Sequence, residues 1–320
     1  MKKLGILFII IFAAFSCKKD SSLERDIQEI GTDITVERFD LLFARANIED
    51  LNELKQGYPF MFAEKYPDSF WVTQMRDTLQ QQLFAEVEKI FPNFDAIEME
   101  IESLFNHLKY YFSEFTPPRV ITTTSMVDYR NKVILTDTIA LLSIDTYLGR
   151  DHEFYAGIQK FIASNLKKEQ IVVDLSNAYA KKYIHQSQPK TLLDEMIYFG
   201  KILYFNDVMI PFKSEAERIG YTEEELQWAR ANESYIWRYF IERELLYSTD
   251  SKLPNRFINP APFTKFYLEE IDNNSPARLG QYIGWQIVRA YMDKNRVPLR
   301  DMLAKRPEDI FINSKFKPRK

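Results

Sequence analysis

The chain is poor in the residues that most often carry catalysis and nucleotide binding. Its 320 residues include only nine glycines, three histidines and one cysteine. Loops that hold phosphate groups use clustered glycines, and neither GxGxxG nor GxxxxGK[ST] occurs, so nucleotide chemistry is disfavoured. The net charge of −4 argues against a protein whose main partner is nucleic acid. These shortages exclude classes of function without naming one.

The chain is rich in apolar and aromatic residues. Hydrophobic residues make up 46% of the sequence and aromatic residues 15%. This fraction can build a core, so disorder is not expected. At about 100–200 residues per domain, the length fits one large domain or two small ones. No linker-like segment divides the sequence, which favours a single domain.

The first residues have the pattern of a bacterial lipoprotein signal. An apolar stretch over residues 4–15 follows two lysines and is too short to span a bilayer of about 30 Å as a helix. Small residues then lead to the lone Cys17, which is similar to a lipobox. We therefore expect residues 1–16 to be removed as a lipoprotein signal peptide and Cys17 to carry the lipid anchor. The alternative is an ordinary secreted protein.

The residues after Cys17 indicate where the protein is held. Residues 17–33 are polar and are expected to form a tether, which leaves residues 34–320 as the globular domain. Lys18, rather than aspartate, follows the cysteine, and this favours the periplasmic face of the outer membrane over the inner membrane. With Cys17 lipidated, no cysteine remains for a disulfide, so packing alone must stabilise the domain.

Hydrophobic periodicity predicts a mostly helical α+β fold with a small sheet. Three short stretches of β-branched or aliphatic residues, bounded by turn residues, predict strands at 119–124, 133–136 and 139–144. A fourth extended segment, at 36–40, is expected to lead into a helix over 41–46.

Capping signals place several helix starts. Thr191 with Asp194 and Thr222 with Glu225 have the spacing of a capping box, and the second pair is expected to open one long helix to about Tyr247. Ser275-Pro276 predicts the start of the last helix. Within that helix Gly280 and Gly284 are expected to let a neighbouring helix approach closely, and residues 315–320 are expected to be a solvated tail.

The usual catalytic motifs are missing. His107, His152 and His185 show neither HxxxH nor HxH spacing, so no two of them can share a metal ion from one helix or strand. No GxSxG surrounds any serine, which removes the commonest sign of a serine hydrolase. We expect no cofactor and structural roles for the histidines.

One pair of carboxylates could carry chemistry. Glu233 and Glu244 fall on the same apolar stripe of the helix expected after Thr222. A buried carboxylate needs a partner or must be protonated. The pair therefore forms a proton-transfer or ligand site. The alternative is an internal salt bridge, with Arg230 one turn before Glu233 and with Arg238 and Arg243 close by.

Several segments together resemble the GldB family of gliding-motility lipoproteins of the Bacteroidetes. They include LLSIDTYLG at 141–149, LDEMIYFGKILY at 193–204 and YIGWQIV at 282–288, with IGYT at 219–222 and IWRYF at 236–240 between them. The resemblance covers essentially the whole chain. It implies a protein required for gliding, in a machinery that is linked to the type IX secretion system.

A more distant resemblance concerns residues 171–204, which are laid out like the active-site region of zincin-like metallopeptidases. In that register Asp174 and Ala178 occupy the two histidine positions of HExxH, Leu175 the catalytic glutamate position and Phe199 the third zinc-ligand position. The resemblance implies a zincin-like fold without its metal site, because zinc needs at least three donor atoms and a base beside its water.

We therefore expect a non-enzymatic, lipid-anchored envelope protein, a pseudoenzyme that serves as a component or stabiliser of the gliding and secretion machinery. Its expected partners are the membrane, through Cys17, and other envelope proteins; nucleic acid is not among them. The alternative is a periplasmic hydrolase or ligand-binding protein that uses the remnant cleft, with Asp174, Ala178, Phe199, Glu233 and Glu244 as the candidate residues.

Overall fold

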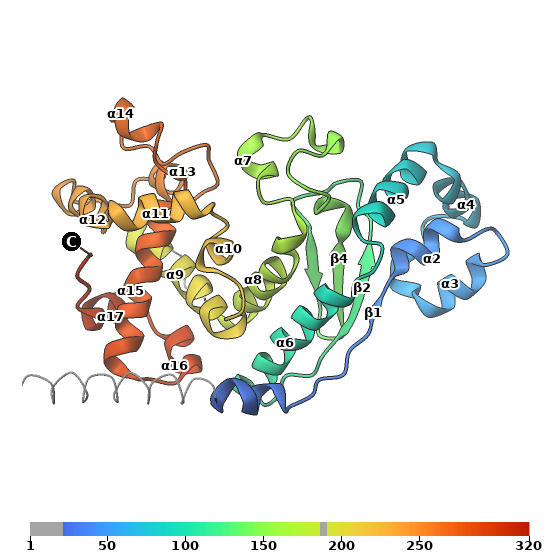
Figure 1. The fold of residues 1–320 in the computed structure, drawn as a ribbon, viewed down its shortest axis with the longest axis horizontal. Helices are drawn as coiled ribbons and strands as arrows, with labels where there is room; N and C mark the ends of the chain where they lie inside the picture. The colour runs from blue at the N-terminus through green and yellow to red at the C-terminus, as the bar shows by residue number, and fades with distance from the viewer. Residues whose placement is uncertain (1–21, 186–190, 320) are drawn as a thin grey trace, which may run out of the picture.

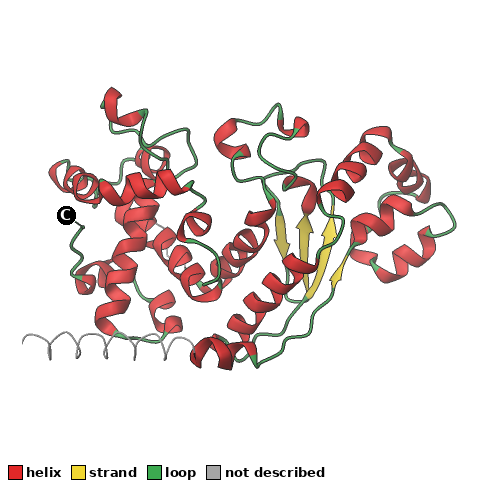
Figure 2. Ribbon diagram, viewed as in Figure 1, coloured by secondary structure: helices red, strands yellow, loops and turns green. Residues whose placement is uncertain are grey.

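A computed structural model describes residues 22–185 and 191–319, and its architecture is a small sheet surrounded by helices (Figure 1). The α+β, mostly helical fold predicted from the sequence is confirmed, and Figure 2 shows the strands confined to one part of the molecule. Cys17 and the predicted signal peptide lie outside the described residues.

The sheet of the described chain has four strands in the order β1-β2-β4-β3. The first three of these are mutually parallel, and β3 runs antiparallel to β4 at the edge. The three strands predicted from β-branched stretches are confirmed to within a residue at each end. The bounds are Val36–Glu37 for β1, Arg119–Thr123 for β2, Val133–Leu135 for β3 and Ile139–Ser143 for β4.

Both faces of the sheet are covered, as is usual for parallel strands. Side chains alternate along β2, so that Val120 packs into the main hydrophobic core and Ile121 into a smaller second one. The smaller core is built by the helices shown in blue at the right of Figure 1, and α6 and α8 belong to the main core. The helices of this half are α2 (Phe39–Arg45), α3 (Leu51–Gly57), α4 (Asp68–Arg76), α5 (Thr78–Ile90) and α6 (Asp95–Tyr111).

The described part of the predicted tether is packed rather than extended. Residues 22–28 are helical, and Ile27 is only 1% exposed. The backbone N–H of Thr32 donates to Asn106 Oδ1 at 2.8 Å, and Glu24 lies 3.4 Å from His107 Nε2, both on α6. Burial of Ile27 and these polar contacts hold the segment against α6, so the described part of the predicted tether, residues 22–33, packs on the domain.

The other half of the chain is helical. Short helices α7 (Lys160–Ala163) and α10 (Glu215–Ile219) accompany the long helices α8 (Ile171–Tyr183) and α9 (Leu192–Met209). The later helices are α11 (Glu223–Ala231), α12 (Glu233–Glu242), α13 (Leu253–Phe257), α14 (Glu269–Asp272), α15 (Leu279–Asn295), α16 (Leu299–Ala304) and α17 (Pro307–Ser314). Within the described chain none of the helices is both long enough and apolar enough to cross a bilayer.

Helices α9 and α15 touch through their backbones at two glycines. A Cβ atom placed on Gly284 would lie 1.8 Å from the carbonyl oxygen of Met196, and one placed on Gly200 would lie 2.4 Å from the carbonyl of Gly284. Gly280 likewise leaves no room for a side chain beside Phe257. The predicted close approach at Gly280 and Gly284 is confirmed, and it fixes α15 against α9.

Both predicted capping boxes are present, at Thr191 with Asp194 and at Thr222 with Glu225. The prediction of one long helix from Thr222 to about Tyr247 is wrong, however, because the helix breaks at Asn232 into α11 and α12, and α12 ends at Glu242. At the break the side-chain amide of Asn232 donates to the carbonyl oxygen of Trp228. A side chain that bonds its own backbone in this way competes with helix continuation.

The predicted start of the last helix at Ser275-Pro276 is also wrong. The Ser275 hydroxyl donates to the carbonyls of Thr264 and Asp272, so it does not cap a helix, and α15 begins at Leu279. Helices α16 and α17 follow it. The C-terminal segment is not a free tail either, because Phe316 packs edge-on against Trp237 at 5.2 Å between ring centroids.

Candidate functional site

A cavity with a volume of about 910 Å³ lies between α8, α9, α10 and the start of α15. The segments 160–166 and 258–262 complete its wall. Its lining mixes charged, amide, aromatic and aliphatic side chains. The charged and amide members are Lys132, Lys160, Asn165, Gln170, Asp174, Asn177, Lys181, Arg218, Glu225, Asn259, Arg278 and Gln281.

Two of the candidate residues named from the sequence line this cavity. Asp174, on the first turn of α8, and Phe199, in the middle of α9, both contribute to the wall. Ala178, one turn further along α8, is half-buried and is not part of the lining. The packing of α8 on α9 therefore brings together part of the predicted remnant cleft.

Asp174 is engaged on the cavity wall. Its carboxylate forms an ion pair with Lys132, which directly precedes β3, and accepts a hydrogen bond from the Tyr147 hydroxyl at 2.9 Å. The Asp174 side chain is 20% exposed. Burial of the phenol, reinforced by the neighbouring Asp174 carboxylate, raises the pKa of Tyr147 well above its ordinary value, so this hydroxyl stays a hydrogen-bond donor.

Glu233 and Glu244 do not share a site. Glu233 is 1% exposed and accepts hydrogen bonds from the Tyr282 hydroxyl at 2.8 Å and from the backbone N–H of Arg319 at 2.9 Å. Glu244 is exposed beyond the end of α12, with φ of +53°. The expected common stripe is wrong because the helix ends before Glu244. The expected partner Arg230 is wrong, since it pairs with Glu215, but Glu233 does form an internal ion pair, 3.9 Å from the Arg319 guanidinium.

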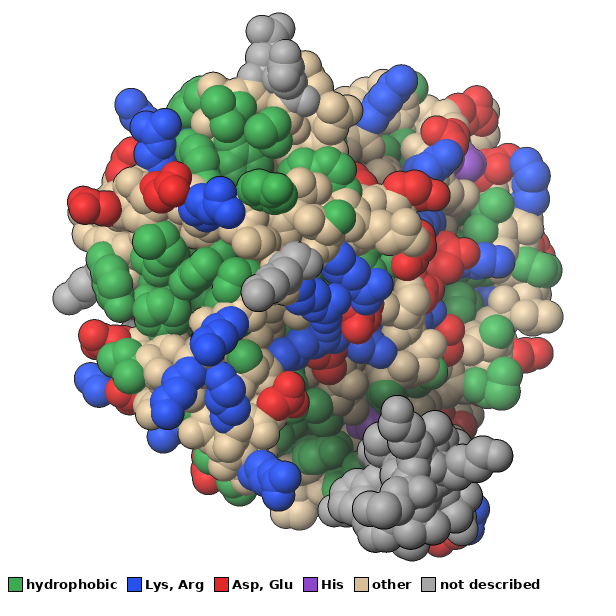
Figure 3. All heavy atoms as spheres, turned by 60° about the vertical axis from the view of Figure 1, so that its left-hand side comes forward, with side chains coloured by type: hydrophobic (Ala, Val, Ile, Leu, Met, Phe, Trp, Pro, Cys, Tyr) green, Lys and Arg blue, Asp and Glu red, His purple; other side chains and the backbone are tan. Residues whose placement is uncertain are grey.

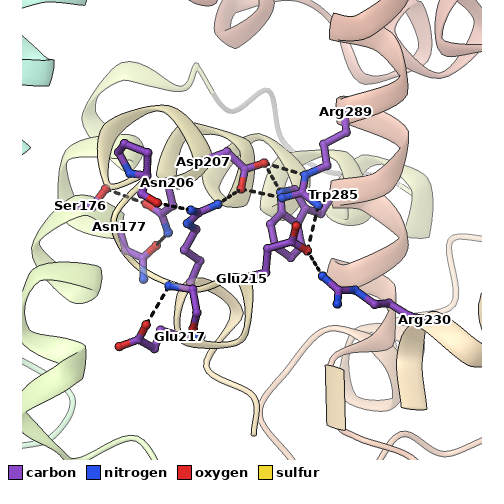
Figure 4. Close-up of polar contacts among 12 residues, drawn as sticks. Ser176, Asn177, Asn206, Asp207, Glu215, Glu217, Arg230, Trp285 and Arg289 are labelled. Atoms are coloured by element: carbon purple, nitrogen blue, oxygen red, sulfur yellow. Dashed lines mark hydrogen bonds and ion pairs between the residues drawn. The ribbon is translucent and has the colours of Figure 1, made fainter. Parts of the chain in front are cut away.

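A polar network that sequence analysis missed stiffens the wall beside the cavity (Figure 4). Asp207, near the end of α9, accepts hydrogen bonds from Arg218, from Trp285 and, through two nitrogens, from Arg289, all at 2.7–2.8 Å. Burial alone would raise the pKa of Glu215, but Arg289 and Arg230 hold it below its ordinary value. Charge-assisted bonds of this kind are stronger than neutral ones.

The same network links α9 to α8. The Ser176 hydroxyl donates to Asn206 Oδ1 at 2.7 Å, and Asn206 Nδ2 donates to Asn177 Oδ1 at 2.8 Å. Figure 4 shows these amides beside Asp207. A buried polar cluster with its members paired is rigid. Helix α9, which lines the cavity, is therefore held by its backbone contact with α15 and by hydrogen bonds to α8.

A buried carboxylate shapes the loop that carries Tyr129 into the cavity lining. Asp145 accepts hydrogen bonds from the backbone N–H groups of Ser125 at 3.0 Å and Val127 at 2.7 Å. Met126 and Val127 both have positive φ, a conformation that costs L-residues energy and that the Asp145 contacts offset. Burial raises the pKa of Asp145, although these N–H groups oppose the shift.

The three histidines lie at separate places. His107 is buried with its Nδ1 atom 2.8 Å from the Ser103 carbonyl, His152 lies 3.2 Å from Glu86, and His185 is exposed. Across residues 22–185 and 191–319 no group of three His, Cys, Asp or Glu side chains is arranged to hold a metal ion. Neither Ala178 nor Phe199 carries a donor atom. The described lining of the cavity is therefore charged and rich in amides, but it contains no set of side chains that could coordinate a metal ion.

The basic residues of the lining were not identified from the sequence. Lys160 and Lys181 are exposed and make no ion pair with the described part of the chain, whereas Arg278 stacks on Tyr221 and donates to the Gly220 carbonyl. These residues come from α7, α8 and the start of α15, and the last of them, Arg278, lies 118 residues after Lys160. No sequence motif links these residues, so only the folded structure shows that they lie around one cavity.

Fold and cavity together define a mostly helical α+β domain with a polar cavity and none of the usual catalytic motifs. A sequence model of the family described as gliding motility protein GldB, a lipoprotein family, matches residues 20–318. The chain belongs to this family, as predicted, and is thereby related to gliding motility. No curated protein and no solved structure matches the chain. The zincin-like resemblance stays a prediction.

Proposed function

We propose that the protein is a lipid-anchored component of the gliding machinery that works by binding other envelope proteins. Membership of the GldB family supports the link to gliding, and the lipobox-like sequence at Cys17 supports the anchor. Two lipid chains or more at one cysteine give stable attachment, which a single chain does not. On this proposal the domain acts at the periplasmic face of the outer membrane, together with the type IX secretion system.

The state of Asp174 is the observation that carries the non-catalytic role. A zinc hydrolase needs at least three donors on its ion and a base beside the bound water. Of the four positions that the zincin-like register singles out, Leu175, Ala178 and Phe199 are apolar, and Asp174 is paired with Lys132. The cavity is then better suited to binding than to hydrolysis. The rival hydrolase based on Glu233 and Glu244 loses support because their carboxylates lie apart.

The anchor is tested by metabolic labelling with a palmitate analogue in the native bacterium. The wild-type protein is expected to be labelled and to fractionate with the membrane, and Cys17→Ala is expected to abolish both. A Cys17→Ala protein that keeps its label would contradict lipidation at this residue.

The binding role is tested by photo-crosslinking in gliding cells. A crosslinking amino acid placed at exposed positions around the cavity rim is expected to capture envelope proteins of the gliding or secretion machinery. The same group placed on α4, far from the cavity, is the control. Equal capture at both positions, or no adduct at any position, would argue against a binding surface at the cavity.

A further inference from the structure

The charges that line the cavity are unbalanced. Five cationic side chains line it, namely Lys132, Lys160, Lys181, Arg218 and Arg278, against the two carboxylates of Asp174 and Glu225. Asp174 neutralises Lys132, and Asp207, behind the wall, pairs with Arg218. Lys160, Lys181 and Arg278 are left without a carboxylate partner among the described residues. A concave surface with a surplus of one sign concentrates its field on whatever enters.

Figure 3 shows that Lys and Arg side chains also gather near the centre of one face of the molecule, next to a broad apolar area. The overall charge of the chain is nevertheless −4. Positive charge is therefore concentrated locally on a protein that is acidic as a whole. Nonspecific attraction by a basic protein does not explain such a pattern, which fits an anionic ligand at a defined place.

The amide side chains of the lining have hydrogen-bonding capacity to spare. Asn165, Gln170, Gln281 and Asn259 each donate through their nitrogen to a neighbouring oxygen of the protein. Their carbonyl oxygens accept no hydrogen bond within the described chain. Four acceptors of this kind around one cavity can receive the backbone N–H groups of an extended chain.

We propose that the cavity binds an acidic peptide segment of a partner protein, with Lys160, Lys181 and Arg278 receiving its carboxylates and the lining amides its backbone. This inference rests on the proposed binding role and names the chemistry of the partner. The volume of about 910 Å³ lies at the upper end of the range for small-ligand sites, so it accommodates a segment of several residues.

The lining offers apolar as well as charged surface. The apolar lining residues that keep exposed surface are Tyr129, Phe161, Ile162, Phe199, Pro260, Ala261 and Pro262. They can contact the apolar side chains of a peptide that alternates these with acidic residues. Arg278 is preorganised as well, because its guanidinium stacks 5.3 Å from the Tyr221 ring centroid and donates to the Gly220 carbonyl.

The test measures fluorescence anisotropy with the full-length protein, purified from membranes in detergent. The probe is a labelled decapeptide that alternates Glu with Ala and Val, and the matched probe carries Gln in place of each Glu. At low salt the Glu peptide is expected to bind at least about tenfold more tightly than the Gln peptide, and added salt is expected to weaken the difference.

The decisive variant is the double substitution Lys160→Gln/Lys181→Gln. Both lysines are exposed and form no ion pair with the described residues, so the fold is expected to persist, which circular dichroism verifies. At about two- to threefold per exposed ion pair, the double variant is expected to bind the Glu peptide about fivefold more weakly. The control is Lys65→Gln/Arg76→Gln on the α4 side of the molecule, which removes the same charge and should change the affinity by less than about twofold.

Three results would overturn the proposal. These are equal affinity for the Glu and Gln peptides, equal loss in the lysine and control variants, and lysine-dependent binding of oligogalacturonate that is tighter than that of the Glu peptide. The last would assign the cavity to an acidic sugar. Absence of peptide binding together with positive photo-crosslinking at the rim would reject the acidic ligand and leave the proposed binding role intact, so the two failures are distinguishable.

Discussion

Replacing Gly284 by alanine tests the backbone contact between α9 and α15. The added Cβ would lie 1.8 Å from the Met196 carbonyl oxygen, and real Cβ atoms essentially never approach closer than 3.0 Å. The two helices must therefore separate locally by about 1.2 Å, since no rotamer change can move a backbone oxygen out of the way. Overpacking of this kind costs about 3 kcal/mol, while alanine regains about 1 kcal/mol of helix propensity. A net loss of about 2 kcal/mol is expected.

The assay is urea unfolding of residues 18–320, followed by both circular dichroism and tryptophan fluorescence. Trp285 follows Gly284 directly and is fully buried, so it reports on this contact. Coincident transitions and an unchanged slope with urea would allow the midpoint shift to be read as free energy. Gly57→Ala is the matched control, because a Cβ there meets no atom within 4 Å. If both variants are equally stable, the reasoning from the backbone contact is refuted.

Two further predictions use the same unfolding assay. Glu233→Ala leaves the Tyr282 hydroxyl and the Arg319 N–H without their acceptor and should cost about 3 kcal/mol, whereas Glu244→Ala should change stability by less than about 0.5 kcal/mol; equal effects would contradict the burial difference. Burial lowers the pKa of Lys201 to about 8, below the 10.5 of the unfolded chain, so the unfolded state binds more protons between these values. The contribution of Lys201 to the free energy of unfolding should rise by up to about 3 kcal/mol from pH 8 to pH 10.5. It is measured as the difference between the wild type and Lys201→Met, because buried tyrosines such as Tyr147 lower the stability of both proteins at the upper end of this range; parallel pH profiles would contradict the assignment.

Local signals in the sequence predicted what local physics decides. The strands at 119–123 and 139–143 follow from short runs of β-branched or aliphatic residues bounded by turn residues. The capping boxes at Thr191 and Thr222 follow from the reach of a side chain to the third backbone N–H of the helix. The spacing of Gly280 and Gly284 likewise predicted a close approach, although it did not name the partner helix α9. Each of these signals is read from a few consecutive residues.

Features that depend on distant partners were not predicted. The helix break at Asn232 leaves Glu233 at the start of α12, where it meets Arg319, 86 residues further along the chain. A periodicity argument cannot see this partner, so it placed Glu233 and Glu244 on one stripe. Asp174 was named from a motif register, yet its pairing with Lys132 is a tertiary contact. The lysines and amides of the cavity likewise meet only after α7, α8 and α15 have packed.

The α9–α15 contact and the proposed peptide site are parts of one arrangement. Arg278 and Gln281 lie at the start of α15. Their position in the cavity wall depends on how closely that helix packs against Gly200 of α9. Asp207 holds Arg218 from the same side of the cavity. One wall is thus fixed by backbone contact and charge, while the segment 160–166 presents Lys160, which forms no ion pair with the described residues. When a ligand binds to a rigid wall, little side-chain entropy is lost, because the groups of the wall are already ordered. Displacing α15 by Gly284→Ala should therefore weaken acidic-peptide binding even under conditions in which the domain remains folded.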